Sequence, residues 1–190
     1  MALRWATTDD GDALAAVYGP AVTDSVASFE LDPPDGAEMA RRVSATMPAH
    51  PWLVLERDGA VVGFAYAHRF HGRAAYDWSA ETSIYVHPDR WRSGAGRALY
   101  AALLAIMREQ GLCRAVAGIS LPNPGSVGLH EAFGFRPVGV YHRIGWKFGA
   151  WHDVGHWELD LQPDATPPSP PVPATSLPAP FLARVLRDAG

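Results

Sequence analysis

Two spacings of hydrophobic residues alternate along this chain, one typical of strands and the other of helices. Residues 52–57 and 60–68 are rich in apolar residues and flank Asp58-Gly59, a pair favoured in tight hairpin turns, so we expect two antiparallel strands there. Strand-forming residues predict further strands at 3–6, 82–86, 115–119, 138–142 and near 154–161. Together these segments predict a mostly antiparallel sheet.

The helical spacing is strongest after residue 94, where apolar residues recur three and four positions apart until Gly111 provides a stop. Thr8 or Asp9 is expected to cap an earlier helix, Asp35 a second one, and residues 127–133 to form a short fourth. Helices interspersed with a mixed, mostly antiparallel sheet predict an α/β (α+β) fold in one domain, residues 1–162. The apolar face of the long helix comprises Ala98, Leu99, Ala102, Leu103, Ile106 and Met107.

Beyond residue 162 the composition changes. Residues 163–180 hold eight of the 17 prolines, which predicts a disordered, polyproline-like linker without a packed core. Residues 181–190 could form one or two amphipathic helical turns. Two interpretations stay open for this segment: a disordered tail, or a segment that docks on a partner or a second subunit.

Composition narrows the function classes. The formal net charge of -4 argues against a general nucleic-acid binder. The single cysteine, Cys113, permits no intrachain disulfide, so a reducing cytoplasm is the simplest location. No apolar run is long enough for a membrane span and no signal sequence is recognisable. The chain is expected to be a cytoplasmic protein of 190 residues with no membrane or nucleic-acid partner.

A glycine-rich turn joins the strand at 82–86 to the long helix. Glycines at 94 and 96 let the backbone approach an anion, and the free N–H groups of the helix point at it. Leu99 replaces the third glycine of a dinucleotide-binding turn, and the Gly-Lys-Ser/Thr ending of a P-loop is absent. The pattern V-x-P-x-x-x-x-x-G-x-G instead resembles the acyl-CoA turn of the GNAT acetyltransferase superfamily.

The resemblance implies a set of acetyl-CoA contacts and the GNAT fold. One departure is Trp91, which stands where the family usually has Gln or Arg, beside Arg92. The implied cofactor-binding residues are Ile84, Tyr85, Val86, Arg92, Ser93, Gly94, Ala95, Gly96, Arg97, Asn123 and Ser126. A backbone N–H near Tyr85 or Val86 is implied as an oxyanion donor.

A second motif spans residues 123–135 and matches the superfamily pattern N-x-x-S-x-x-L-x-E-x-x-G-F. Ser126 is expected to cap the helix here, and His130 lies on the same helix face. By resemblance, the residue at position 130 is the one that protonates the departing thiolate. From the residues alone, His130 could also be a second base, or a packing or capping histidine.

Residues 76–81 and 145–155 resemble phosphinothricin N-acetyltransferase and its amino-acid N-acyltransferase relatives, and the resemblance runs from about residue 3 to residue 161. It implies transfer of an acetyl group from acetyl-CoA to a small amino acid or amino-acid-like antimetabolite, of the phosphinothricin, methionine sulfone or methionine sulfoximine type, by direct attack in a ternary complex. Two alternatives stay open: a protein-amine acetyltransferase, and a catalytically silent acyl-CoA-binding module. The resemblance also implies a homodimer.

Alternation along the strand at 82–86 puts Glu81, Ser83 and Tyr85 on one face, which should meet the substrate. An ammonium group must lose a proton before it attacks a thioester, so Glu81 is the predicted base, although an isolated Glu is more often a solvated residue or an ion-pair partner. The resemblance implies an acceptor pocket of Phe29, His71, Arg73, Tyr76 and Tyr85.

Within that pocket Arg73 can hold a carboxylate through two parallel N–H bonds. His71 stands where phosphinothricin-detoxifying relatives carry lysine, which weakens the expectation of phosphinothricin itself. His152 and His156 have a spacing that could suggest a metal site, but Trp146, Trp151 and Trp157 favour a packed aromatic cluster, so no metal is expected.

Overall fold

The computed structural model describes residues 1–163 and 167–189. These residues form a seven-stranded sheet with the order β1-β2-β3-β4-β5-β7-β6, in which only the β4–β5 pair is parallel. The mixed, mostly antiparallel sheet confirms the predicted fold class. The strands are β1 Ala2–Trp5, β2 Trp52–Arg57, β3 Ala60–Arg69, β4 Ser79–Val86, β5 Arg114–Leu121, β6 Arg136–Lys147 and β7 Ala150–Asp160.

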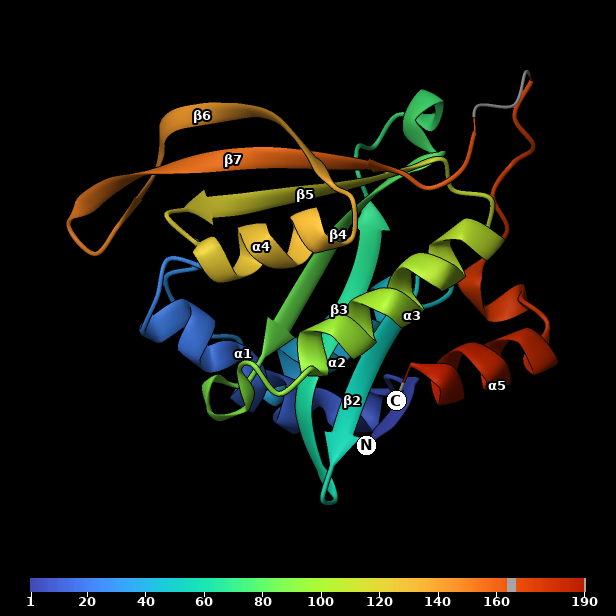
Figure 1. Ribbon diagram of the computed structural model, residues 1–190. Helices are drawn as coiled ribbons and strands as arrows, with labels where there is room; N and C mark the ends of the chain where they lie inside the picture. The colour runs from blue at the N-terminus through green and yellow to red at the C-terminus, as the bar shows by residue number, and fades with distance from the viewer. Residues whose placement is uncertain (164–166, 190) are drawn as a thin grey trace.

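Helices cover both faces of the sheet (Figure 1). Alternation along β2 sends Leu53 and Leu55 into a core with α3, while Trp52 and Val54 pack with α1 and α2 on the other face. No helix among the described residues combines the length and apolar character that a membrane span requires. The α-helices are α1 Gly11–Thr23, α2 Gly36–Thr46, α3 Ala95–Glu109, α4 Pro124–Ala132 and α5 Ala179–Asp188.

Two helix starts test the predicted caps. Asp35 caps α2 as predicted, because its carboxylate accepts the Glu38 N–H at 2.8 Å. The prediction of Thr8 or Asp9 as the cap of α1 was wrong. A 3₁₀ turn at Thr8–Asp10 precedes the helix, and the N-cap of α1 is Asp10, whose carboxylate accepts from Arg4 at 2.6 and 2.8 Å. This ion pair holds the helix start against β1.

The pair β4–β5 separates along its length. Their register runs only from Ser79 to Glu81 on β4, although β4 continues to Val86 and β5 to Leu121. The two strands diverge visibly beyond that point (Figure 1). The N-terminal end of α3 follows β4 and α4 follows β5, so both helix starts lie beside this opening.

The C-terminal segment differs from the expected linker. Val172 donates its N–H to the Gln110 carbonyl at 2.8 Å, the Trp78 indole donates to the Ser169 carbonyl at 2.7 Å, and Ala174 and Leu177 are buried. Because a polyproline helix has no internal hydrogen bonds, the backbone groups of this segment bond to residues of the domain instead. Helix α5 packs against α3 and β1. Residues 164–166 of the expected linker and residue 190 of the expected C-terminal segment lie outside the described residues.

Candidate functional site

The glycine turn opens α3 with backbone donors. Gly94 has a φ of 87° and is the N-cap, a conformation that residues with a side chain rarely adopt. The first helical hydrogen bond runs from Ala98 N–H to the Gly94 carbonyl at 3.0 Å, so the N–H groups of Ala95, Gly96 and Arg97 have no partner within the helix. This end of α3 fits a phosphate or another anion.

Side chains around the turn close it against β4. The Trp91 indole donates to the Val86 carbonyl at 2.9 Å, and the Ser93 hydroxyl donates to the Arg90 carbonyl at 2.6 Å. Arg92 is exposed with a φ of 60°, and the Arg97 guanidinium lies 5.7 Å from the centre of the Phe133 ring. Both arginines therefore add positive charge next to the free N–H groups.

The edge of β4 presents further donors to the opening. His87 donates its N–H to the Val62 carbonyl of β3 at 2.9 Å. Because successive N–H groups point to opposite edges of a strand, those of Val86 and Ile84 point away from β3, toward the β5 side. The N–H of Tyr85 points to β3 instead, and its ring packs against Tyr18 with centres 4.7 Å apart.

Asn123 and Ser126 lie at the start of α4, on the β5 side of the opening. The prediction that Ser126 caps this helix was wrong. Asn123 is the N-cap, because its side-chain oxygen accepts the Ser126 N–H at 3.1 Å.

His130 lies in a buried chain of hydrogen bonds. Its Nδ1 is 2.7 Å from the Ser126 carbonyl and its Nε2 is 2.7 Å from the Tyr100 hydroxyl, which lies 2.6 Å from the Thr82 hydroxyl. A carbonyl only accepts, so Nδ1 carries the proton and Nε2 accepts from Tyr100. Thr82 can then donate to Tyr100. This chain joins α4, α3 and β4.

Burial keeps the ring neutral. It lowers the pKa of His130, which is 3% exposed, and it raises the pKa of Tyr100. Thr82 faces α3, so its neighbour Glu81 faces the opposite side of the sheet. The structure therefore does not bring the two predicted catalytic residues, Glu81 and His130, together.

Glu81 lies on the face that carries Ser83 and Tyr85, as predicted. Its side chain is 34% exposed, and Oε2 is 4.0 Å from Nε2 of His68, its cross-strand neighbour on β3. Tyr66 lies opposite Ser83, and burial raises the pKa of its phenol. A carboxylate placed this way is reachable from solvent and could accept a proton.

Tyr85 of β4 is one of the five predicted acceptor residues, and the other four come from two loops. Between β3 and β4, the His71 and Tyr76 rings meet edge to face with centres 4.9 Å apart, and the Arg73 carbonyl accepts the Tyr76 N–H at 3.0 Å. Phe29 belongs to the loop between α1 and α2 and packs over Gly145 of β6, leaving no room for a Cβ there. Among the described residues, no hydrogen bond or ring contact joins Phe29 to the first loop.

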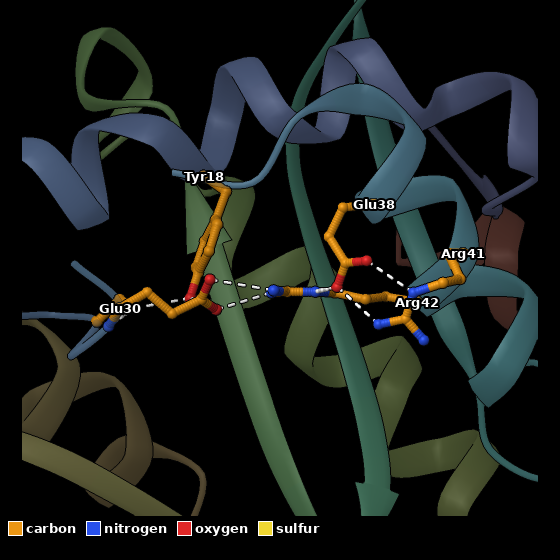
Figure 2. Close-up of polar contacts among 6 residues, drawn as sticks. Tyr18, Glu30, Glu38, Arg41 and Arg42 are labelled. Carbon is orange, nitrogen blue, oxygen red and sulfur yellow. Dashed lines mark hydrogen bonds and ion pairs between the residues drawn. The ribbon is translucent and has the colours of Figure 1, made fainter. Parts of the chain in front are cut away.

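Charged residues fix the Phe29 loop (Figure 2). The Arg42 guanidinium donates to both oxygens of Glu30 at 2.7 and 3.0 Å, and the Tyr18 hydroxyl donates to Glu30 at 2.9 Å. Arg42 lowers the pKa of Glu30. On the other side of Phe29, the buried Lys147 ammonium donates to the Ser28 carbonyl at 2.7 Å. The loop is therefore tied to α1, α2 and β6.

Known proteins share this arrangement. The sequence matches the model of the Acetyltransferase (GNAT) family over residues 22–135. The chain belongs to the GNAT acetyltransferase family. A phosphinothricin N-acetyltransferase of Streptomyces viridochromogenes is 39% identical over 92% of this chain and 95% of its own length. An L-methionine sulfoximine/L-methionine sulfone acetyltransferase of Salmonella typhimurium is 31% identical over 88% of this chain and 98% of its own.

A crystal structure similar to this acetyltransferase was solved with the cosubstrate. It is a GNAT superfamily phosphinothricin acetyltransferase of Sinorhizobium meliloti in complex with AcCoA, 35% identical, with a TM-score of 0.83 over 88% of this chain and 91% of that one. The family assignment and the acyltransferase activity predicted from the two motifs are thereby confirmed.

The sequence alone did not place several further residues on the Glu81 face of this acetyltransferase. His68 lies beside Glu81 on β3, while Gly118 and Ser120 of β5 and His156 of β7 continue the same face. Strand order and register, which are not visible in a single sequence, bring them together. Within residues 1–163 and 167–189, no group of three or more His, Cys, Asp or Glu side chains is placed to hold a metal ion.

Proposed function

We propose that this acetyltransferase moves the acetyl group of acetyl-CoA to the amino group of a free amino acid or a close analogue, by direct attack in a ternary complex. The observation that carries the proposal is the opening between β4 and β5, with free helix N–H groups at one end and Glu81 at the other. The names of the relatives, which include acetyltransferases of phosphinothricin and of methionine sulfoximine and sulfone, support this acceptor class.

The turn before α3 would hold the cosubstrate's pyrophosphate. The N–H groups of Ala95, Gly96 and Arg97 supply donors there, and Arg92 and Ser93 flank them. Farther into the opening, the N–H groups of Ile84 and Val86 are available to the cosubstrate's amide-bearing arm and thioester, with Asn123 and Ser126 on the β5 side. When bound, acetyl-CoA supplies the activated acyl group, and these residues orient it.

Glu81 would take the proton that the acceptor ammonium must lose, directly or through a water. His130 would act from the other face of the sheet, because its ring holds α4 and β4 in place through Tyr100 and Thr82. A proton-donor role for His130 would require it to exchange one of those hydrogen bonds for a substrate contact.

Arg73 would pair with the acceptor carboxylate, and Phe29, His71, Tyr76 and Tyr85 would line the remainder of the site. Arg73 is exposed on the loop that precedes β4, the strand that carries Glu81. A guanidinium can hold a carboxylate in a bidentate geometry, which favours free amino acids over amines that lack an acidic group.

A homodimer in the cytoplasm completes the proposal. Exposed apolar side chains gather on the β6–β7 hairpin, and the Trp146–Trp151 pair is more than half exposed, whereas Trp157 is buried in the main core. The expected single aromatic cluster was therefore wrong. An exposed apolar face of this kind favours a second copy of the chain as its cover, and light scattering in solution would measure the mass.

The function is tested by measuring CoA release over a panel of acceptors. Methionine sulfone, methionine sulfoximine and phosphinothricin should react, with phosphinothricin the poorest because of its extra charge beside His71. Methyl esters of the same compounds should lose about tenfold to a hundredfold in kcat/KM, because the charge-assisted hydrogen bonds to Arg73 disappear. Faster reaction with lysine-bearing peptides would favour the protein-amine alternative, and no release from any acceptor would favour the silent module.

A substitution at Gly94 tests the cosubstrate site. Gly94→Val should weaken acetyl-CoA binding by at least about tenfold, since it disturbs the donors of a charge-assisted site. Gly59→Val is the matched control, because Gly59 also has a positive φ and open surroundings but lies in the β2–β3 hairpin turn. Calorimetric titration of both folded variants gives the comparison. Equal affinities would place the pyrophosphate elsewhere.

A further inference from the structure

The sheet face that carries Glu81 continues across β5 to a histidine on β7. Gly118 of β5 is the cross-strand partner of His156, and alternation places both on the face opposite the α3 core. Glu81 is the last β4 residue in register with β5. A carboxylate and an imidazole therefore stand on either side of a glycine at the place where the strands begin to diverge.

Because Gly118 has no side chain, a single space is left between the side chains of Glu81 and His156. A Cβ at this position would lie 3.4 Å from Oε1 of Glu81 and 3.8 Å from Cε1 of His156, and Gly118 itself is exposed. The two polar side chains thus approach the same spot from neighbouring strands. Because Gly118 is exposed, that spot is open to solvent.

His156 has an unused hydrogen-bonding atom. Its Nε2 is buried and has no hydrogen-bond partner among the described residues, and the same holds for the Ser120 hydroxyl two residues beyond Gly118. The Tyr141 ring lies edge to face with the imidazole, with centres 4.9 Å apart, and supports its orientation. An unpaired buried polar group costs stability and calls for an explanation, and a bound ligand provides one.

We propose that His156 is a further acceptor-binding residue, which holds the attacking amino group over Gly118 together with Glu81. The inference deepens the proposed function and rests on it. The carboxylate of Glu81 takes one proton, so an N–H bond of the ammonium breaks and an O–H bond forms. His156 accepts a hydrogen bond through Nε2 from one of the N–H groups that remain, with no proton transfer, and the nitrogen lone pair is left free to attack.

Three variants test the role of His156. His156→Phe keeps a ring against Tyr141 but removes the nitrogen, and it should lower kcat/KM for the acceptor by about threefold to tenfold, the loss expected for one hydrogen bond between neutral groups. His156→Gln, whose amide can reach a similar point, should restore part of that loss. Acetyl-CoA affinity should stay at the wild-type level in both variants, and thermal stability should not fall in either.

The third variant, Gly118→Ala, fills the shared space. The added methyl makes only ordinary van der Waals contacts, so the fold should survive, while the acceptor loses its place and KM for the acceptor rises. Gly139→Ala on β6, where a Cβ would meet nothing within 4 Å, is the control that should leave the kinetics unchanged.

The outcomes separate this inference from the proposed function. If the wild-type chain releases CoA and His156→Phe matches its kcat/KM, the inference is overturned and the proposed function stands. If His156→Phe also lost acetyl-CoA affinity and thermal stability, His156 would have a structural role, and the inference would again be overturned. A wild-type chain that releases no CoA with any acceptor overturns the proposed function, and the inference falls with it.

Discussion

Replacing Glu81 with Gln should reduce turnover by about 10² to 10⁴-fold, the usual contribution of general acid or base catalysis, while acetyl-CoA still binds. The amide keeps the shape of the side chain but cannot take the ammonium proton. The expected loss is larger than for any acceptor-binding residue, because every acceptor must be deprotonated before it attacks. Steady-state kinetics with methionine sulfone at neutral pH, together with calorimetric titration of acetyl-CoA, measure both quantities.

Glu56→Gln is a suitable control for this experiment. Its side chain is 33% exposed, close to the 34% of Glu81, and it is also paired with a basic residue, but it lies on β2 away from the opening. Turnover in this variant should match the wild type. If Glu81→Gln retained near-wild-type turnover, Glu81 would be a structural residue and the base would have to be sought elsewhere on the same face.

His130→Ala should lower the free energy of unfolding by about 3 kcal/mol, within the range for removing a large buried side chain. The substitution leaves a cavity and removes a partner from Tyr100 and from the Ser126 carbonyl. Tyr100→Phe breaks the same chain without a cavity and should cost only about 1 kcal/mol. Urea denaturation of both variants gives the comparison, and turnover should also fall because α4 shifts.

The stability contribution of His130 should depend on pH. Burial lowers its pKa in the folded chain below the ordinary histidine value of 6.5, so below that pH the unfolded chain binds the proton more readily than the folded one. The contribution is present above pH 6.5 and is lost as the pH falls from there toward the folded pKa. His50 also has a pKa lowered by burial, so the curve of His130→Gln must be subtracted from that of the wild type.

A different result would change the role of His130. If His130→Ala unfolded with wild-type stability and yet lost turnover as severely as Glu81→Gln, the ring would act on the substrate directly. The buried hydrogen-bond chain would then have to open during the reaction, and the pH profile of turnover would move in the His130 variants.

The sequence predicted those parts of the structure that depend on local spacing. The Asp58-Gly59 hairpin, the apolar face of α3 and the Asp35 cap all follow from residues a few positions apart. Strands β6 and β7 extend beyond their predicted lengths. The prediction of β6 was too short because much of this strand is exposed and lacks an alternation between buried and exposed residues. Hydrophobic pattern alone cannot mark such a strand.

The site depends on contacts between distant segments, and these the sequence could not supply. The family motifs placed Glu81 and His130 at the site, but only the pairing of strands shows that the sheet lies between them. In the same way, the register of β5 with β7 is needed before His156 and Gly118 can be seen near Glu81. The register between strands that are far apart in the chain cannot be predicted from a single sequence.

The packing of α5 against β1 has a consequence for synthesis of the chain. These two elements are separated by almost the whole sequence, yet they cover the same region of the main core, in which Leu3 contacts the layer that Leu177 and the α5 side chains complete. A nascent chain therefore cannot close this core until residues 179–188 have left the ribosome. Until then β1 and part of α3 expose apolar surface, which makes the partly synthesised chain more prone to aggregation than the finished one.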